Sequence, residues 1–150
     1  MIAVERSPER LLCDTSFVGL SAKREAQPER FSHWPAPLLS RINQAILAIS
    51  VITLAEARFG YRNAGWGAAR IEREERRLAS LLQVPLDLEI VDEWARLRDL
   101  SKRHGWNVGD NDLWIAATAS SRGYGLVTCD SDQARIEDPA LEILHLPPPS

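Results

Sequence analysis

Cysteine is scarce in this sequence: Cys13 and Cys129 are the only two among 150 residues. Two thiols cannot build the multiple-disulfide framework that stabilises many small secreted domains. Each cysteine ends an apolar run, so we expect both to be small, buried packing residues. No apolar run is long enough to cross a bilayer, and residues 1–6 lack the apolar core of a signal peptide. These absences favour a cytoplasmic protein that does not enter the membrane.

Histidine and lysine are also rare. The three histidines, His33, His104 and His145, are far apart and have no metal-ligand spacing, which argues against a zinc site. Lysine occurs only at Lys23 and Lys102, so nearly all positive charge is carried by arginine, which binds phosphate well but also pairs with acids. The net charge of −3 excludes a strong overall attraction to nucleic acid.

Apolar runs alternate with amphipathic segments along most of the chain. The apolar runs favour strands over residues 10–13, 44–49, 83–86, 126–129 and 141–146. The amphipathic segments favour helices that start near residue 17 and that cover residues 51–62, 68–82, 88–104 and 112–122. Residues 26–40 contain three prolines and indicate a loop or a broken helix. Strands that alternate with helices predict an α/β fold with a parallel sheet.

The length suits one domain with a sizeable core. We place this domain at residues 10–146, between a polar N-terminal extension at residues 1–9 and a proline-rich tail at residues 147–150. No internal repeat indicates a second domain.

Four carboxylates stand where these elements begin or end. Asp14 ends the first strand and Asp130 ends the fourth, while Glu56 and Asp112 lie in the first turns of helices. In parallel α/β sheets, ligands bind beyond the carboxyl ends of the strands, where the strand order reverses. We therefore expect the four side chains to face one point at that edge of the sheet.

The two helices also have a simpler interpretation. Ser50 is a suitable N-cap for the helix that contains Glu56, and Asp110 or Asn111 is a suitable N-cap for the helix that contains Asp112. Acids are favourable in first turns because the helix N-terminus carries partial positive charge. Glu56 and Asp112 could thus be unrelated acids that only stabilise helix starts.

A cluster of carboxylates needs compensation, because like charges a few ångströms apart raise each other's pKa. A divalent cation supplies it, and oxygen ligands without cysteine or histidine favour Mg²⁺ or Mn²⁺. Such an ion can bind a phosphate, activate water and stabilise a leaving oxygen. The predicted chemistry is hydrolysis of phosphodiester bonds.

The choice between Asp130 and Asp132 rests on a strand-register argument. Cys13-Asp14 and Cys129-Asp130 are matching pairs at the ends of two strands that we expect to be parallel neighbours. If the cysteines are in register, Asp14 and Asp130 emerge side by side. Asp132 lies two residues further on, where a turn-forming role is more common, although it could reach a second metal.

Arg58 and Arg62 lie one turn apart on the helix that contains Glu56 and could share a face. They are candidate contacts for an RNA phosphate or for an acidic segment of a protein partner. Ion pairing with acids, or simple solvation, explains them equally well.

The acids stand in four motifs that, in this order, resemble a PIN-domain ribonuclease, most closely the VapC-type toxins of bacterial toxin–antitoxin systems. The motifs are Leu11-Leu12-Cys13-Asp14-Thr15-Ser16, Ser50-Val51-Ile52-Thr53-Leu54-Ala55-Glu56, Asn111-Asp112-Leu113-Trp114-Ile115-Ala116-Ala117-Thr118-Ala119 and Leu126-Val127-Thr128-Cys129-Asp130. The resemblance covers residues 10–146 and implies a PIN-like parallel-sheet sandwich. It also implies Mg²⁺- or Mn²⁺-dependent RNA cleavage, a homodimer and neutralisation by a VapB-type antitoxin.

By position, the resemblance assigns the acidic quartet to Asp14, Glu56, Asp112 and Asp130. Thr15 and Thr128 match neighbouring hydroxyl positions, which can orient carboxylates or water. One position departs from the pattern: many relatives carry an acid followed by phenylalanine after the fourth quartet acid, whereas here Asp132 is followed by Gln133.

Alternatives remain at this stage. A receiver domain would need a late lysine, and a haloacid-dehalogenase-like phosphatase would need Asp-x-Asp after the first strand; both are missing. A PIN-fold RNA-processing nuclease outside a toxin–antitoxin pair is compatible with the residues, as is a PIN-fold binding module without catalytic activity.

Overall fold

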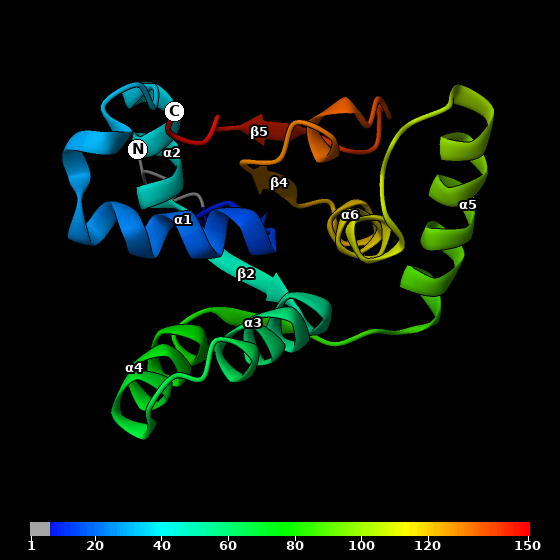
Figure 1. The fold of residues 1–150 in the computed structure, drawn as a ribbon. Coiled ribbons are helices and arrows are strands. Elements are labelled where there is room, and N and C mark those ends of the chain that lie inside the picture. The colour runs from blue at the N-terminus through cyan, green and yellow to red at the C-terminus, as the bar shows by residue number, and fades with distance from the viewer. Residues whose placement is uncertain (1–6) are drawn as a thin grey trace, which may run out of the picture.

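Five parallel strands lie at the centre of residues 7–150, the part of the chain that the computed structural model describes (Figure 1). The strands are β1 (Arg10–Cys13), β2 (Ile46–Ser50), β3 (Leu82–Val84), β4 (Gly125–Thr128) and β5 (Ile143–His145). The helices are α1 (Thr15–Ala26), α2 (Ala36–Gln44), α3 (Val51–Asn63), α4 (Ala68–Ala79), α5 (Leu88–His104) and α6 (Asp110–Arg122), with short 3₁₀ helices η1 (Pro28–Phe31) and η2 (Gln133–Arg135). Most of the expected N-terminal extension, residues 1–6, lies outside the described residues.

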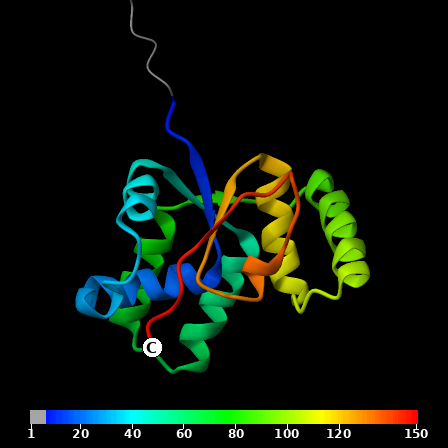
Figure 2. The same cartoon turned by 90° about the horizontal axis from the view of Figure 1, so that it is seen from above.

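The strand order is β3-β2-β1-β4-β5, which confirms the predicted α/β fold with a parallel sheet. From β1 the chain adds β2 and then β3 on one side, and it then crosses to the other side of β1 to add β4 and β5 (Figure 2). The order therefore reverses between β1 and β4. Ligands of parallel α/β sheets bind at such a reversal, so the ends of β1 and β4 are the positions to examine.

Helices cover both faces of the sheet because its strands are apolar on both sides. Leu11 and Cys13 pack with residues of α1, α2 and α4, whereas Leu12, between them, packs with residues of α5 and α6. This alternation follows from the two-residue repeat of a strand. Both cysteines are buried and free, as predicted. The result is a sheet between two layers of helices, which agrees with the expected parallel-sheet sandwich.

Several helix ends follow the sequence signals, and one does not. Ser50 caps α3 as predicted, with its hydroxyl accepting a hydrogen bond from the Thr53 amide at 3.2 Å. Gly105 ends α5 in the left-handed conformation, at φ 67°, which costs glycine little. The predicted cap of α6 by Asp110 or Asn111 is wrong: Gly109 is the N-cap, and Asp110 is already helical. An extra acid therefore stands in the first turn of α6, where a carboxylate is favourable.

The element bounds differ most in residues 26–50. The structure has α2 where we expected a loop or broken helix, and the strand predicted to start at residue 44 begins at Ile46. Pro35 is the N-cap of this helix, and Pro37 falls in its first turn, where a missing amide donor costs nothing. Prolines that we interpreted as helix breakers thus begin a helix. Two other strands are shifted relative to the prediction. β3 starts one residue earlier than expected, at Leu82, and β4 stops at Thr128, before Cys129.

The register of β1 and β4 also differs from the prediction. The two strands are parallel neighbours, but Cys13 pairs with Val127 and not with Cys129. The Asp14 amide donates to the Val127 carbonyl at 3.0 Å, which places Asp14 beside Thr128. Local sequence similarity of the two Cys-Asp pairs could not set this register, because inter-strand hydrogen bonds and packing determine it.

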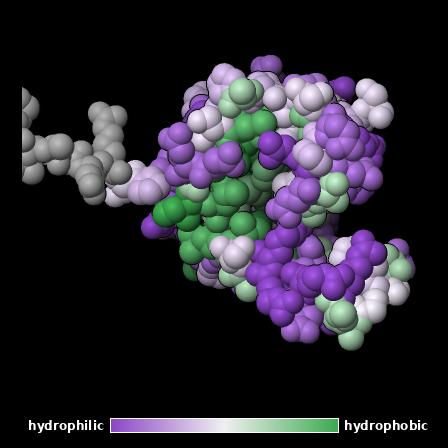
Figure 3. All heavy atoms as spheres, turned by 90° about the vertical axis from the view of Figure 1, so that its left-hand side faces the viewer, coloured by the Kyte–Doolittle hydropathy of each residue, from purple (hydrophilic) through white to green (hydrophobic). Residues whose placement is uncertain are grey.

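Apolar side chains also reach the surface on one side of the molecule. Figure 3 shows them next to hydrophilic residues on the side where α1, α2 and α4 lie. A hollow of about 240 Å³ opens there, and its apolar lining includes Val18, Leu39, Leu47 and Leu81. In the part of the chain that the structure describes, no helix is both long and apolar enough to span a bilayer.

Candidate active site

Asp14 directly follows β1 and is 2 % exposed. Its Oδ1 atom accepts hydrogen bonds from the Ser16 hydroxyl at 2.7 Å and from the Phe17 amide at 2.9 Å, so Asp14 is also the N-cap of α1. Its Oδ2 atom accepts from the Thr128 hydroxyl. Burial raises the pKa of Asp14, as does the charge of Asp130, whereas the three hydrogen bonds lower it. The carboxylate is therefore held in one orientation at the strand-order reversal.

Thr128 links the ends of the two central strands. Its hydroxyl donates to Asp14 and accepts a hydrogen bond from the Asp130 amide at 3.0 Å. The Oδ1 atom of Asp130 in turn accepts from the Asp132 amide at 2.9 Å. The loop after β4 is thereby fixed to β1, with Asp130 close enough for its charge to affect Asp14.

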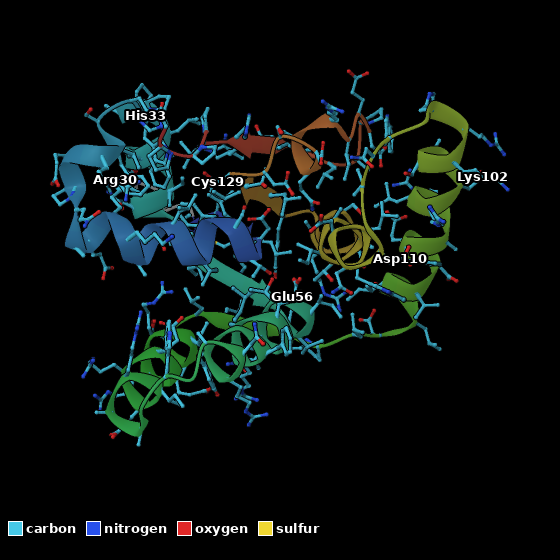
Figure 4. The ribbon with its side chains drawn as sticks, viewed as in Figure 1. Arg30, His33, Glu56, Lys102, Asp110 and Cys129 are labelled. Atoms are coloured by element: carbon cyan, nitrogen blue, oxygen red, sulfur yellow. The ribbon has the colours of Figure 1, made fainter. Side chains whose placement is uncertain are left out.

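Glu56 is partly exposed on α3, and its Oε1 atom accepts a hydrogen bond from the Thr15 hydroxyl at 2.7 Å. Thr15 also lies 3.2 Å from the hydroxyl of Thr53, a fully buried residue of α3. Figure 4 shows Glu56 in the space between α3, α1 and α6. A surface depression of about 560 Å³, lined by Thr15, Ala55, Glu56, Phe59 and Asn111, opens beside this carboxylate.

Asp112 lies in the first turn of α6, and its pKa is raised to about 6. Partial burial is the largest cause, followed by the charges of Asp130, Asp14, Glu56 and Asp132, in that order. The structure thus brings all four predicted quartet acids, which are spread over more than a hundred residues of sequence, into one electrostatic cluster. The alternative of isolated capping acids does not explain this convergence, although Asp14 caps α1 as well.

The donor chemistry of the cluster fits a hard divalent cation. Its donors are carboxylate oxygens, which Mg²⁺ and Mn²⁺ favour. The nearby thiols of Cys13 and Cys129 are not competing ligands, because burial and the charge of Asp14 raise their pKa, that of Cys129 to about 12. Within residues 7–150, no three acidic, histidine or cysteine side chains already form a ligand shell, so an ion would have to draw the carboxylates together.

The side chain of Arg58 is not free to contact a phosphate, because it is paired with an acid. Its Nε and Nη2 atoms donate to the two oxygens of Glu75 on α4, at 2.9 and 3.1 Å. The Tyr61 hydroxyl donates to the same carboxylate at 2.7 Å. Arg62, one turn further along α3, is exposed. The two arginines therefore differ in environment, although the sequence treats them alike.

Sequence reasoning missed three residues that hold the cluster together: Ser16, Thr53 and Gln133. Ser16 orients Asp14 and also accepts a hydrogen bond from the Cys129 amide at 3.0 Å. Gln133 is fully buried, and its Nε2 atom donates to the Asp112 carbonyl at 3.0 Å. The sequence did contain a signal for two of them. Ser16 is a hydroxyl residue two positions after Asp14, and Gln133 is a polar residue where many relatives carry phenylalanine.

The fold and this cluster define an α/β domain with an acidic site at the reversal of strand order. Residues 12–139 match the family described as "PIN domain", and the chain belongs to this family. It is 33 % identical over 132 residues to Ribonuclease VapC4 of Mycobacterium tuberculosis, covering 86 % of this chain and 92 % of the relative. It is 38 % identical over 107 residues to Ribonuclease VapC5 of the same organism, covering 67 % and 76 %.

A solved structure shares the same architecture. The crystal structure of VapBC-5, a member of the VapBC family of toxin–antitoxin systems from M. tuberculosis, superposes with a TM-score of 0.65 at 29 % identity. The match covers 92 % of this chain and 99 % of that chain. The resemblance inferred from the four motifs is thereby confirmed for family and fold.

Proposed function

We propose that this protein is a metal-dependent endoribonuclease and the toxin of a toxin–antitoxin pair, neutralised by a VapB-type antitoxin. The observation that carries the proposal is the placement of Asp14 and Asp130 after the neighbouring strands β1 and β4, joined through Thr128, where the strand order of a PIN fold reverses. The VapC ribonucleases that the chain resembles are named for RNA cleavage, and this activity is the one that the cluster suits.

We propose Asp14, Glu56, Asp112 and Asp130 as the residues that would hold Mg²⁺ or Mn²⁺ and that catalyse cleavage. When bound, the ion would neutralise the cluster, hold the scissile phosphate and activate water. The side chains differ in freedom: Asp14 is fixed by three hydrogen bonds, and Glu56 is oriented by Thr15. Asp112 is the group whose protonation changes near pH 6, and a neighbouring cation favours its ionised form.

RNA has to approach an acidic site, so cationic contacts near it are needed. We assign this role to Arg62 rather than Arg58, because Arg58 is bound to Glu75 at two points. Each phosphate contact adds to the salt dependence of binding. Arg62→Ala should therefore make RNA binding weaker and less salt-dependent, and Arg58→Ala should change the salt slope less. Equal slopes for all three proteins would remove both arginines from the RNA site.

The apolar hollow beside α1, α2 and α4 supports an inhibitory protein partner. An amphipathic helix can place its apolar face in such a surface, and a basic side chain from the same partner could reach the carboxylates. We also propose a homodimer, as the resemblance to VapC-type toxins implies; Leu88 and Val91, one turn apart on α5, expose 81 % and 43 % of their surface and are candidate contacts. Sedimentation at micromolar concentration tests the dimer; a monomer would contradict it.

Expression in a bacterial host tests the toxin assignment. The protein alone should stop growth, Asp14→Asn should not, and co-expression with the adjacent reading frame should restore growth. If protein that cleaves RNA in vitro is harmless when expressed alone, the nuclease acts outside a toxin–antitoxin pair.

A further inference from the structure

Gln133 occupies an unusual position for a polar side chain. It is the first residue of η2, three residues after Asp130, and none of its surface is exposed. One half of its amide is used: Nε2 donates to the backbone carbonyl of Asp112 at 3.0 Å. The other half, Oε1, is buried and has no hydrogen-bond partner in the described part of the chain. An apolar side chain of similar length would fill the same space without burying an unpaired oxygen.

The hydrogen bond of Gln133 joins the two halves of the acidic cluster. Asp130 and Asp132 lie on the loop before η2, whereas Asp112 lies on α6. The Ala134 amide donates to the Asp130 carbonyl at 3.0 Å, so η2 and the acidic loop form one hydrogen-bonded unit. Gln133 attaches this unit to the turn that carries Asp112.

The charges across this junction repel each other. Asp112 lies in the first turn of α6, and Asp130 and Asp132 lie on the loop that Gln133 attaches to that turn, so carboxylates stand on both sides of the junction. Like charges on separate segments move apart unless other contacts hold them. The hydrogen bond that Gln133 Nε2 donates to the Asp112 carbonyl at 3.0 Å can oppose that movement. It leaves the carboxylate of Asp112 free for a ligand.

We propose that Gln133 is a positioning residue, which fixes the distance between Asp112 and the Asp130 loop so that both can hold one cation. This proposal rests on the proposed function. Gln133 is buried and cannot touch RNA, so its role is confined to the geometry of the acids. Replacing a residue that supports a metal ligand typically lowers metal affinity or activity by about 10–100-fold.

The test variant is Gln133→Met, which keeps an unbranched side chain and removes the amide. Its matched control is Thr118→Val, because Thr118 is also fully buried and donates to a backbone carbonyl of α6, that of Trp114, at 2.8 Å. The measurements are Mn²⁺ affinity by calorimetry, thermal unfolding of the metal-free proteins, and kcat and KM for RNA.

The proposal predicts that Gln133→Met melts close to the wild-type temperature, because removal of the unpaired oxygen offsets loss of the hydrogen bond to Asp112. It also predicts that Gln133→Met binds Mn²⁺ about tenfold more weakly. It predicts a lower kcat with little change in KM, and wild-type Mn²⁺ affinity for Thr118→Val. A Gln133→Met protein with Mn²⁺ affinity and kcat within about twofold of wild type would overturn it, since a hydrogen bond of purely structural value affects neither.

Gln133→Leu serves as a second variant if Gln133→Met does not fold. If neither folds while Thr118→Val does, Gln133 acts in stability and the positioning role is wrong. Wild-type protein that neither binds Mn²⁺ nor cleaves RNA would contradict the proposed function itself. Wild-type protein that does both, with Gln133→Met indistinguishable from it, would contradict only the positioning role.

Discussion

Asp112 is the acid whose pKa is raised by the charges of the other acids in the site. Its pKa of about 6 in the folded protein lies above its usual value of 3.8. The folded state therefore binds this proton more tightly than the unfolded chain does, and folding is favoured where the proton is bound. The free energy of unfolding of the metal-free protein should consequently decrease as the pH rises from about 4 through about 6.

Chemical denaturation at about pH 5 and about pH 7.5 measures this effect. Asp112→Asn cannot ionise, so it should lose less stability between the two pH values than wild type, and it should be the more stable protein at the higher pH. Equal losses in the two proteins would show that burial and the neighbouring charges do not raise the pKa of Asp112.

The two acids after β4 should differ in importance. Asp130 contributes more than Asp132 to the pKa of Asp112, whereas Asp132 lies 3.7 Å from Arg135 and accepts a hydrogen bond from Asn107 at 3.4 Å. Asp130→Asn should weaken Mn²⁺ binding and RNA cleavage, and Asp132→Asn should change both less. Wild-type metal binding and rate in Asp130→Asn, with loss of activity in Asp132→Asn, would reverse the assignment.

At the scale of elements, local signals predicted helices better than strand register. The bounds of α5 were predicted in full, because an amphipathic stripe between Asp87 and Gly105 marks both ends. The fold class correctly predicted β1 and β4 as neighbours, but the register predicted from the Cys-Asp pairs was two residues off, since register depends on hydrogen bonds between segments over a hundred residues apart. Gln133 stayed unassigned for the same reason: its partner, Asp112, is identified only after folding.

The N-cap of α3 provides a prediction at this scale. Ser50 is fully buried, and its bond to the Thr53 amide fixes the start of the helix that carries Glu56. Ser50→Ala should lower the free energy of unfolding by about 1 kcal/mol in urea titrations. Ser80→Ala is the control, because Ser80 is exposed at the end of α4. A Ser50→Ala loss no larger than that of the control would show that this cap contributes little.

At the scale of the whole molecule, the chain brings together acids that sequence proximity could not. Asp14 and Asp130 follow β1 and β4, which end at one edge of the sheet where the strand order reverses, and Glu56 and Asp112 lie near enough for the charges of the four acids to interact. The net charge of −3 is small, so the repulsion is local to this edge. The sequence was sufficient to predict the edge of the sheet near which these acids lie, whereas the hydrogen bonds that orient Asp14 and Glu56 required the folded structure.

A cation that binds only the folded protein should stabilise the whole molecule. Mn²⁺ at about 100 times its dissociation constant should add about 2.7 kcal/mol to the free energy of unfolding. Thermal unfolding with and without Mn²⁺ measures the shift, and a protein with both Asp14→Asn and Asp112→Asn should show little of it. A wild-type melting temperature that does not rise up to millimolar Mn²⁺ would argue against a metal site.

Cleavage of labelled RNA tests the central claim most directly, with purified wild type and Asp112→Asn each assayed in Mg²⁺, in Mn²⁺ and with a chelator. The account predicts cleavage by wild type only with a divalent ion, and a rate for Asp112→Asn lower by about 10²-fold or more, the effect of losing one strong electrostatic contact. Undiminished cleavage in the chelator, or a folded Asp112→Asn protein that cuts RNA at the wild-type rate, would contradict it.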